Sequence, residues 1–228
     1  MPRRPTRACV PLLSRRPDLG HLPPVGRATC YRCFRPEVGC ICRLVRQVPN
    51  QTHVLIVQHP RERKHPFGTA RIAKLGLSKV EVLLAQKEYP DGDLWVPHRD
   101  VSNAAVLYPS RTATTLGEGE RVSFDTLVVI DGTWSEARKL LHVTPWLRAL
   151  PCVALQPPRP GNYRIRKAKN PEVEVSTIEA IAYALGHLEP ETVGIGGLVE
   201  DFDAVIDHQI GLQAGRFVPR VRKGWDGR

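Results

Sequence analysis

The sequence predicts an α/β protein whose mostly parallel sheet is flanked by helices on both faces. Two observations lead to this fold class. Several short runs are apolar throughout, as expected for strands that are buried on both faces of a sheet. Helical patterns lie between and after these runs, and this alternation is typical of a parallel sheet with covering helices.

The strand candidates are rich in Val, Leu and Ile, which favour strands. In chain order they are residues 53–58, 79–85, 104–109, 126–131 and 152–156. The helix candidates are residues 69–77, 134–143, 176–188 and 198–214. Two of these helices begin at a capping-box pattern, Thr133-x-x-Glu136 and Ser176-x-x-Glu179. In the last helix, apolar residues recur at helical spacing, so this helix should pack on the body of the protein.

The composition is that of an ordinary soluble protein. The chain has 228 residues, 42% hydrophobic and 25% charged, which is enough for one catalytic domain with appendages. No apolar run approaches the roughly 20 residues that span a bilayer, and the N-terminus lacks the apolar core of a signal peptide. We therefore expect a cytoplasmic protein that does not bind a membrane. The sequence also lacks a Walker loop, a Gly-x-Gly-x-x-Gly motif and a His-Glu-x-x-His motif, which argues against ATP, a conventional dinucleotide site and a zinc hydrolase.

Positive charge is concentrated in three segments. The net charge is +10, and residues 1–29, 159–169 and 216–228 contribute +5, +5 and +4, which leaves about −4 for the rest of the chain. A solubilising tail would explain one basic terminus. Three separate basic segments around a mildly acidic body favour a polyanionic partner, and we expect nucleic acid.

Four of the six cysteines fall within thirteen residues, in the pattern Cys30-x2-Cys33-x6-Cys40-x-Cys42. Two close pairs of thiolates match the four soft ligands of a structural, tetrahedral Zn²⁺ site. Two disulfides or a redox Cys-x-x-Cys motif are the alternatives, and both fit poorly without a secretion signal or a βαβ unit around these residues.

The cysteines define a small segment within a larger organisation. We expect a basic flexible segment at 1–27, a zinc knuckle at 28–45, a catalytic domain at 50–215 and a basic tail at 216–228. The knuckle carries Arg32, Arg35 and Arg43, which are candidates for contacts with RNA.

The first catalytic candidate is Asp131, in the stretch Asp131-Gly132-Thr133-Trp134. α/β proteins place reacting groups at the carboxyl ends of buried strands, and a glycine lets another molecule approach the backbone. The structural alternative is that Thr133 only caps the next helix and that Trp134 is a core anchor.

Two further blocks carry polar residues at element ends. Gln58-His59-Pro60-Arg61-Glu62 closes the first strand and is followed by Thr69-Ala70-Arg71, a rigid rim suited to a ligand or phosphate. Tyr163-Arg164-Ile165-Arg166-Lys167 precedes the second capping box. A tyrosine among arginines can stack a base while its neighbours hold phosphates, as in the recognition of single-stranded RNA.

Together, the cysteine cluster and these three blocks resemble the DTW-domain family of tRNA-uridine aminocarboxypropyltransferases. The resemblance covers about residues 30–185. It implies a fold related to the knotted SPOUT methyltransferases, an exception to the rule against threaded chains. It also implies that S-adenosylmethionine donates its 3-amino-3-carboxypropyl group to N3 of a uridine in tRNA, with release of methylthioadenosine.

On this basis we assign candidate roles to individual residues. Asp131 is the general base that takes the N3 proton. Trp134 is the second catalytic candidate, as a wall that encloses the methyl group of the donor. The candidates for binding S-adenosylmethionine are Pro60, Ile130, Gly132, Thr133, Leu155, Ser176, Thr177 and Glu179. The candidates for binding tRNA are Arg61, Arg71, Tyr163, Arg164, Arg166 and Lys167. The zinc ligands are Cys30, Cys33, Cys40 and Cys42.

Two alternatives remain open from the sequence. An RNA methyltransferase on the same scaffold would transfer a different carbon of the donor. A zinc-containing RNA-binding protein without catalysis would use both capping boxes only as caps, although a pure cap needs neither Asp131 nor Gly132. Either a monomer or a homodimer fits the sequence.

Overall fold

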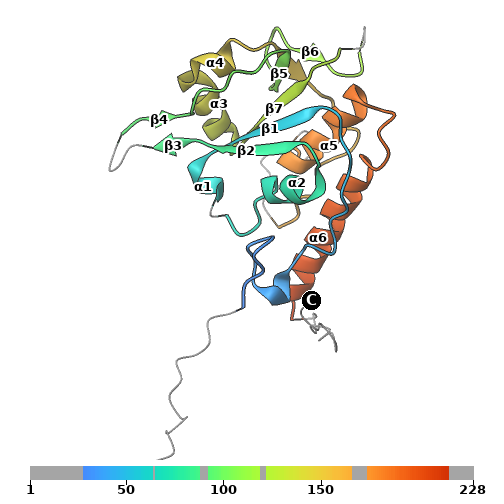
Figure 1. Cartoon of the computed structure of the whole chain (residues 1–228). Coiled ribbons are helices and arrows are strands. Elements are labelled where there is room, and N and C mark those ends of the chain that lie inside the picture. The colour runs from blue at the N-terminus through green and yellow to red at the C-terminus, as the bar shows by residue number, and fades with distance from the viewer. Residues whose placement is uncertain (1–27, 64, 88–91, 119–121, 166–173, 216–228) are drawn as a thin grey trace, which may run out of the picture.

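The computed structural model describes residues 28–63, 65–87, 92–118, 122–165 and 174–215 (Figure 1). Two of the predicted RNA-binding residues, Arg166 and Lys167, and the segments 1–27 and 216–228 lie outside these described residues. None of the described helices combines the length and apolar character needed to cross a membrane.

The centre of the structure is a six-stranded sheet with the order β2-β1-β7-β5-β8-β6, in which every pairing is parallel. The strands are β1 (His53–Gln58), β2 (Val80–Leu84), β5 (Ala104–Leu107), β6 (Thr114–Thr115), β7 (Thr126–Asp131) and β8 (Cys152–Ala154). All five predicted strands are therefore confirmed, and β6 is an addition. Strands β3 (Gln86–Lys87) and β4 (Leu94–Trp95) form a separate antiparallel pair.

Helices cover both faces of the sheet, as predicted (Figure 1). One face carries α2 (Ala70–Gly76), α5 (Thr177–Leu188) and α6 (Gly197–Gln213). The other face carries α3 (Trp134–Val143) and α4 (Pro145–Arg148). A short helix, α1 (Pro60–Arg63), follows β1, and a 3₁₀ turn, η2 (Glu37–Gly39), lies within the cysteine segment.

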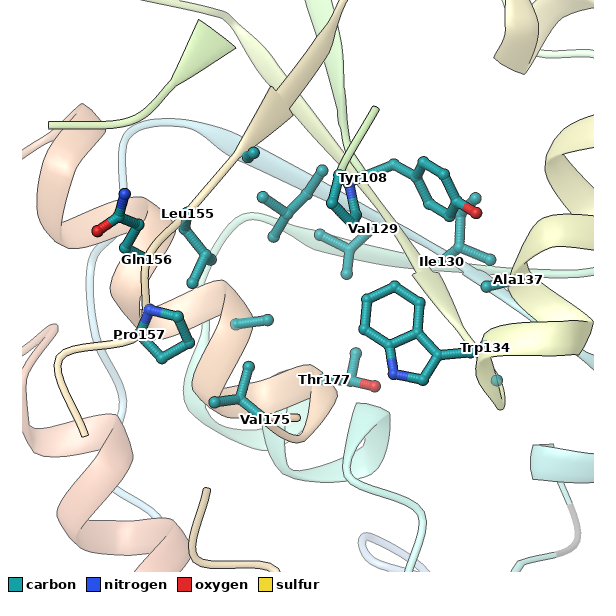
Figure 2. A pocket seen from close by; sticks show the side chains of 15 residues that line it. Tyr108, Val129, Ile130, Trp134, Ala137, Leu155, Gln156, Pro157, Val175 and Thr177 are labelled. Carbon is teal, nitrogen blue, oxygen red and sulfur yellow. The ribbon is translucent and has the colours of Figure 1, made fainter. Parts of the chain in front are cut away.

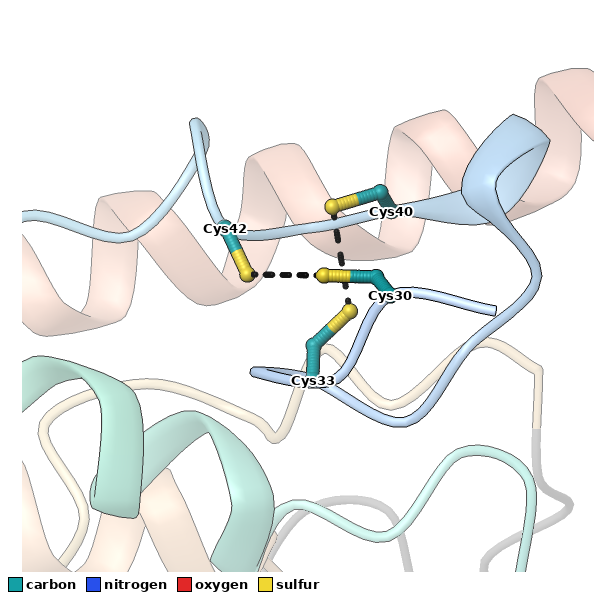
Figure 3. Close-up of side chains that lie close together, drawn as sticks. All are labelled: Cys30, Cys33, Cys40 and Cys42. Atoms are coloured by element: carbon teal, nitrogen blue, oxygen red, sulfur yellow. Dashed lines mark hydrogen bonds between the residues drawn. The ribbon is translucent and has the colours of Figure 1, made fainter. Parts of the chain in front are cut away.

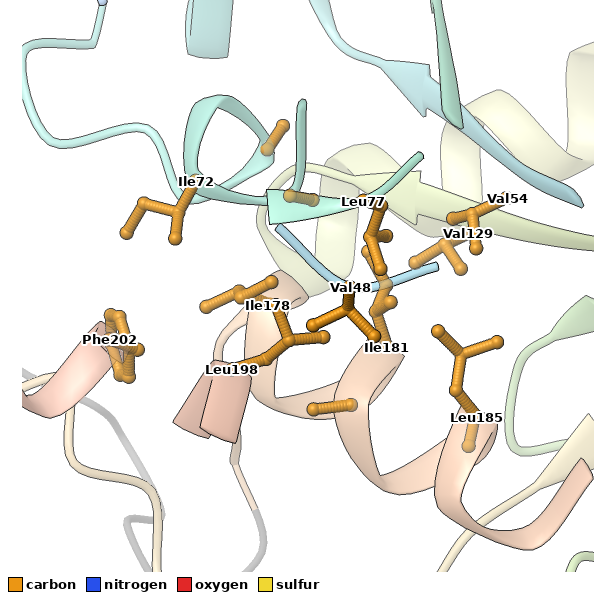
Figure 4. Close-up of a cluster of buried hydrophobic side chains, with 14 of the residues drawn as sticks. Val48, Val54, Ile72, Leu77, Val129, Ile178, Ile181, Leu185, Leu198 and Phe202 are labelled. Carbon is orange, nitrogen blue, oxygen red and sulfur yellow. The ribbon is translucent and has the colours of Figure 1, made fainter. Parts of the chain in front are cut away.

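Burial on both faces of the sheet explains the apolar runs in the central strands. Val54 and Ile56 of β1 belong to the hydrophobic cluster under α2, α5 and α6, part of which is drawn in Figure 4. Leu55 and Val57 alternate with them and belong to the cluster under α3 and α4. All four side chains are at most 1% exposed. Because successive side chains of a strand point to opposite faces, a strand covered on both faces must be apolar at every position.

The cysteine segment is packed onto α6. Cys33, Ile41 and Val45 belong to the same hydrophobic cluster as Phe202 of α6. Directly after them, the backbone N–H of Arg46 donates to Asp201 at 2.7 Å, and its Nε donates to the other carboxylate oxygen at 2.8 Å. The cysteine segment is therefore continuous with the core of the α/β body.

Candidate functional site

Asp131 is the last residue of β7, and its side chain is held from two sides. It lies in register with Gln58, the last residue of β1. The hydroxyl of Thr177 donates to Oδ1 of Asp131 at 2.6 Å, and the side-chain amide of Gln58 donates to Oδ2 at 2.9 Å. The residue is 4% exposed. Both carboxylate oxygens thus have a fixed orientation at the carboxyl edge of the sheet.

A cavity of about 480 Å³ opens at the carboxyl ends of β5, β7 and β8 (Figure 2), and Ile130 and Gly132, the chain neighbours of Asp131, line it. Its size is typical of sites for small molecules and cofactors, roughly 300–1,000 Å³. Its walls are mainly apolar, and a few polar groups are placed among them. The lining residues are Leu107, Tyr108, Pro109, Val129, Ile130, Gly132, Trp134, Ala137, Ala154, Leu155, Gln156, Pro157, Val175, Thr177 and Ala180. Below we call this space the donor cavity.

Trp134 forms one wall of the donor cavity (Figure 2). It is 50% exposed, and its ring meets that of Tyr108 edge to face, with centroids 6.4 Å apart. A tryptophan that served only as a core anchor would be largely buried. The exposed ring on a cavity wall favours the functional interpretation of this residue.

The donor cavity lies between the amino ends of two helices. Trp134 is the first residue of α3, and Thr177 is the first residue of α5. The amino end of a helix carries partial positive charge and unpaired backbone N–H groups. The two helix ends therefore provide a suitable environment for a carboxylate or another electron-rich group of a ligand.

Both predicted capping boxes are confirmed, and they account for the polar groups of three candidate donor-binding residues. Thr133 and Glu136 form the box that starts α3, and Ser176 and Glu179 form the box that starts α5. Glu179 is fully buried and also accepts the backbone N–H of Asn162 at 2.8 Å. Thr133, Ser176 and Glu179 do not line the donor cavity. Their hydrogen bonds position the helix ends that face it.

The remaining candidate donor-binding residues divide in the same way. Ile130, Gly132, Leu155 and Thr177 line the cavity, whereas Pro60 does not and instead begins α1. Tyr108, Gln156 and Pro157 also line the cavity, although they were not predicted from the sequence. Tyr108 follows β5, and Gln156 and Pro157 come shortly after β8. Their position at the carboxyl ends of these strands is the feature from which they could have been predicted.

Gly132 lies next to a polar cluster formed by the side chains of His59, Arg61 and Glu136. A Cβ atom at this position would lie 3.2 Å from Cβ of Glu136 and 3.4 Å from Cβ of His59. Nδ1 of His59 lies 3.3 Å from Oε1 of Glu136, and Nη1 of Arg61 lies 3.5 Å from the same oxygen. Burial lowers the pKa of His59 below its ordinary value, despite the nearby Glu136 carboxylate. Gly132 thus leaves space for this cluster as well as for a ligand.

A second hollow, of about 560 Å³, is lined by Gln58, whose side-chain amide donates to Asp131. We call it the basic groove. It is lined by Arg32, Phe34, Gln58, Glu62, Arg63, Gly68, Ala70, Arg71, Lys74, Leu75, Val82 and Leu84. Gln58 lines the groove and donates to Oδ2 of Asp131, whereas Thr177 lines the donor cavity and donates to Oδ1. Asp131, which is itself buried, is therefore hydrogen-bonded to one lining residue of each space.

The predicted RNA-binding residues take different positions. Arg71 lines the basic groove. The side chain of Arg61 is 84% exposed, next to Glu136. Arg164 is half-exposed and forms an ion pair with Asp207 of α6, which fixes the start of the basic loop on that helix. Arg61 and Arg71 therefore lie at the surface near the carboxyl end of β1, whereas Arg164 is tied to α6.

Tyr163 is anchored by the body of the protein. Its hydroxyl donates to the backbone oxygen of Phe67 at 2.6 Å, and its ring meets that of Phe202 edge to face at 5.8 Å. These contacts favour a role in holding the basic loop over the stacking role considered from the sequence. Arg35 is likewise buried, at 6% exposure, with its guanidinium 5.7 Å from the centre of the Phe67 ring. Arg35 is therefore unsuited to contact RNA.

The four clustered cysteines converge on one point (Figure 3). All four sulfurs lie within 4.8 Å of one another, with Cys30 and Cys42 at 3.7 Å and Cys33 and Cys40 at 3.8 Å. A disulfide would require about 2.05 Å. In a tetrahedral site with Zn–S bonds of about 2.3 Å, neighbouring sulfurs are roughly 3.8 Å apart. The observed spacing therefore fits a four-thiolate metal site.

The surroundings of the sulfurs differ. Hydrogen bonds from the backbone of Cys33 and Arg32 lower the pKa of Cys30 to about 6. Burial raises the pKa of Cys40 and of Cys42 above the ordinary thiol value. Backbone N–H donors directed at a ligating sulfur are the outer-shell contacts that orient metal ligands.

Together, the fold and the site define an α/β protein with a cavity of small-molecule size at the carboxyl edge of a parallel sheet, a basic groove, and one buried carboxylate that is hydrogen-bonded to a lining residue of each. Comparison with known proteins places the chain more narrowly. Residues 27–210 match the DTW domain, and the chain belongs to this family. No solved structure matches the chain closely enough to be called similar.

Several curated relatives share one function in their names. The chain is 33% identical over 180 residues to tRNA-uridine aminocarboxypropyltransferase 2 of Drosophila melanogaster, covering 73% of this chain and 69% of that protein. It is 31% identical over 193 residues to the Mus musculus protein of the same name, covering 81% and 64%. It is 24% identical over 136 residues to tRNA-uridine aminocarboxypropyltransferase A of Arabidopsis thaliana, covering 52% of each. The chain thus spans about two thirds of the length of the two animal relatives.

Proposed function

We propose that this protein transfers the 3-amino-3-carboxypropyl group of S-adenosylmethionine to N3 of a uridine in tRNA and releases methylthioadenosine. Membership of the DTW family and the names of the relatives support this reaction. The structural observation that carries it is the position of Asp131. One of its oxygens accepts a hydrogen bond from Thr177, which lines the donor cavity, and the other accepts a hydrogen bond from Gln58, which lines the basic groove.

The proposed reaction needs a general base but no general acid. Uridine N3 must lose its proton before its lone pair can attack, and Asp131 can take that proton if N3 lies within about 2.6–3.2 Å. The donor supplies a sulfonium whose bond to the Cγ carbon breaks as the new N–C bond forms, and the sulfur keeps that electron pair as a neutral thioether. Asp131 and its fixed hydrogen bonds therefore perform the one proton transfer, while the cavity aligns the donor and excludes water.

The donor cavity decides which carbon is presented. The methyl carbon of a sulfonium is the least hindered, so selective transfer requires walls that enclose the methyl group. Trp134, Ile130 and Leu155 provide such walls. The hydroxyl of Thr177 already donates to Asp131, so the amino ends of α3 and α5 are the groups that suit the donor carboxylate, which places the carboxypropyl arm near Asp131.

The acceptor tRNA would approach from the basic groove. Arg71 lines that groove and Arg61 is exposed beside Glu136, so both can contact phosphates near the target uridine. We propose that Arg164, Arg166, Lys167 and the two basic termini extend this contact, with Tyr163 holding the loop in place. Gln58 lies between the groove and Asp131, where the uridine base would enter.

We further propose that Cys30, Cys33, Cys40 and Cys42 bind one structural Zn²⁺, because their sulfurs have the spacing that four zinc thiolates require. A closed four-cysteine site has no open position for substrate, so its contribution is to folding. The division into a basic segment at 1–27, a knuckle at 28–45, a catalytic domain at 50–215 and a basic tail at 216–228 belongs to the same proposal.

A relation to the knotted SPOUT fold also remains a proposal. The sheet supports it in general terms, because β7 lies between β1 and β5 and the spatial order of the strands departs from their order in the chain. Mechanical extension of the full chain from both termini tests the knot. A knotted chain stops short of the extended length, about 3.3–3.6 Å per residue, whereas an unknotted chain reaches it.

The reaction is tested by incubating the protein with unmodified tRNA and S-adenosylmethionine labelled separately in the methyl and in the carboxypropyl carbons. We expect the carboxypropyl label to appear in a modified uridine and methylthioadenosine to be released in equal amount. Transfer of the methyl label would instead identify an RNA methyltransferase. Tight binding of tRNA without any transfer would identify an RNA-binding protein and contradict the proposal.

The role of the cavity wall is tested by Trp134→Ala. Removing the ring should weaken binding of S-adenosylmethionine by about 10-fold, since an aromatic wall contributes on the order of 1–2 kcal/mol. The melting temperature should change little because the ring is half-exposed. Trp95→Ala is the matched control, since Trp95 is 44% exposed and lies on β4, outside the donor cavity. Isothermal titration of both variants with the donor decides the point, and equal affinities for the two variants would exclude the wall role.

A further inference from the structure

The turn formed by Cys30 and Cys33 presents an aromatic ring to the basic groove. Phe34 directly follows this turn, lines the groove and is 66% exposed. The same groove is lined by α2 residues such as Arg71, so the cysteine segment forms one wall and the catalytic body forms the other. With Leu75 and Leu84 of the same groove, the exposed phenyl ring offers apolar surface that a ligand can cover.

The backbone conformation at Phe34 is unfavourable for a residue other than glycine. Its φ is +55°, in the left-handed region that favours glycine. The turn enforces this conformation, because the N–H of Phe34 donates to the oxygen of Cys30 at 2.7 Å and the N–H of Cys30 donates to the oxygen of Arg35 at 2.8 Å. A glycine would meet the demand of the turn without strain. The turn accounts for the backbone conformation but not for the phenyl ring, so the ring points to a function.

The charge of the groove indicates the class of partner. Four cationic side chains line it, namely Arg32, Arg63, Arg71 and Lys74. Among the groove-lining residues that the structure describes, Glu62 is the one acidic side chain, and it is 7% exposed. The groove therefore presents positive charge around an apolar ring. Aromatic rings flanked by cations bind unpaired bases and their phosphates, with little preference for sequence.

We propose that Phe34 stacks an unpaired base of the substrate tRNA next to the target uridine, while Arg32 and Arg71 hold its phosphates. Gln58 links this subsite to the proposed general base, because it lines the groove and donates a hydrogen bond to Asp131. A nucleotide on Phe34 would thus position its neighbour toward the general base. The inference rests on the proposed function and assigns part of the substrate recognition to the cysteine segment.

The test compares Phe34→Ala with Tyr31→Ala in the full-length protein. Tyr31 belongs to the same turn and is 90% exposed, but it does not line the groove. Phe34→Ala should raise the Kd for tRNA by about 10-fold or more, as loss of one stacked base does, while Tyr31→Ala should leave it unchanged. Phe34→Trp should restore binding. Arg32→Gln should weaken binding and reduce the slope of log Kd against log salt by about 1.

Phe34→Gly separates recognition from folding. It removes the ring and also relieves the left-handed strain, so the melting temperature should stay equal or rise while tRNA affinity falls as in Phe34→Ala. Metal content of each variant is measured to confirm that the turn is intact. Affinity for tRNA is measured by fluorescence anisotropy without donor, so it is independent of whether the wild type performs transfer.

Two results would overturn the inference. The first is a Phe34→Ala variant that binds tRNA like the wild type, which would leave the groove to another partner such as an acidic peptide. The second is an equal loss in Phe34→Ala and Tyr31→Ala, which would show that the effect does not depend on the groove. If the wild type transfers no group but tRNA binding still depends on Phe34, the subsite stands and the proposed reaction fails.

Discussion

Replacing Asp131 with asparagine should lower the rate of aminocarboxypropyl transfer by about 100-fold to 10,000-fold, the usual contribution of a positioned general base. Binding of S-adenosylmethionine should remain, because Asp131 is not among the residues that line the donor cavity. The physical reason for the loss is that the amide cannot accept the N3 proton of uridine. Single-turnover transfer at saturating donor and tRNA measures the chemical step directly.

The substitution should be tolerated by the fold. The amide oxygen of asparagine can still accept the Thr177 hydroxyl, which now donates to Asp131 at 2.6 Å. The side-chain amide of Gln58 can rotate to present its oxygen to the new NH₂ group. Asp125→Asn is the matched control, since Asp125 is exposed and immediately precedes the other end of β7. Unchanged transfer in Asp131→Asn would exclude the base role, and equal losses in both variants would indicate an indirect effect.

The strands were predictable because burial on both faces left a local signal. In β1 and β7 the four residues between the polar ends are all apolar, since each contributes to one of two hydrophobic clusters. Strand β6 left no such signal. It consists of Thr114 and Thr115 and is defined only by its pairing with β8. A pairing between distant segments cannot be read from two polar residues.

The same distinction applies to the site. Asp131 could be predicted from its place after an apolar run, but its contacts with Gln58 and Thr177 depend on residues 73 and 46 positions away. Tyr163 shows the opposite outcome. Its basic neighbours suggested base stacking, whereas contacts with Phe67 and Phe202, both remote in sequence, hold its hydroxyl and ring. Local pattern thus identified the functional segments, and tertiary contacts decided what each side chain does.

The two capping boxes show how one pattern can carry two meanings. Ser176 and Glu179 were candidates for binding the donor, and their spacing also predicted a helix start. In the structure their polar groups bond each other, and both residues are buried. The function that remains is positional, because this cap fixes the end of α5 from which Thr177 reaches Asp131. Only the three-dimensional position of the cavity separates the residue that faces it from those that support it.

Removal of the proposed zinc, by Cys42→Ser or by a strong chelator, should lower the melting temperature by about 10 °C or more. Structural zinc sites supply much of the folding free energy of the segments that they hold, and each kcal/mol shifts the melting temperature by roughly 2–4 °C in a chain of this size. The loss should extend beyond the knuckle, because Cys33, Ile41 and Val45 share a hydrophobic cluster with α6. Metal analysis and calorimetry of the purified protein measure both parts of the prediction.

Cys152→Ser is the matched control for this experiment. Cys152 is a free cysteine on β8, outside the four-cysteine cluster, and its replacement should leave one zinc per chain and shift the melting temperature by only a few degrees. Loss of the metal should also weaken tRNA binding, because the turn that carries Phe34 forms one wall of the basic groove. A wild-type protein without metal whose clustered cysteines are joined as disulfides would exclude the zinc site. A Cys42→Ser variant that keeps both its metal and its melting temperature would show that the fourth thiolate is not a ligand.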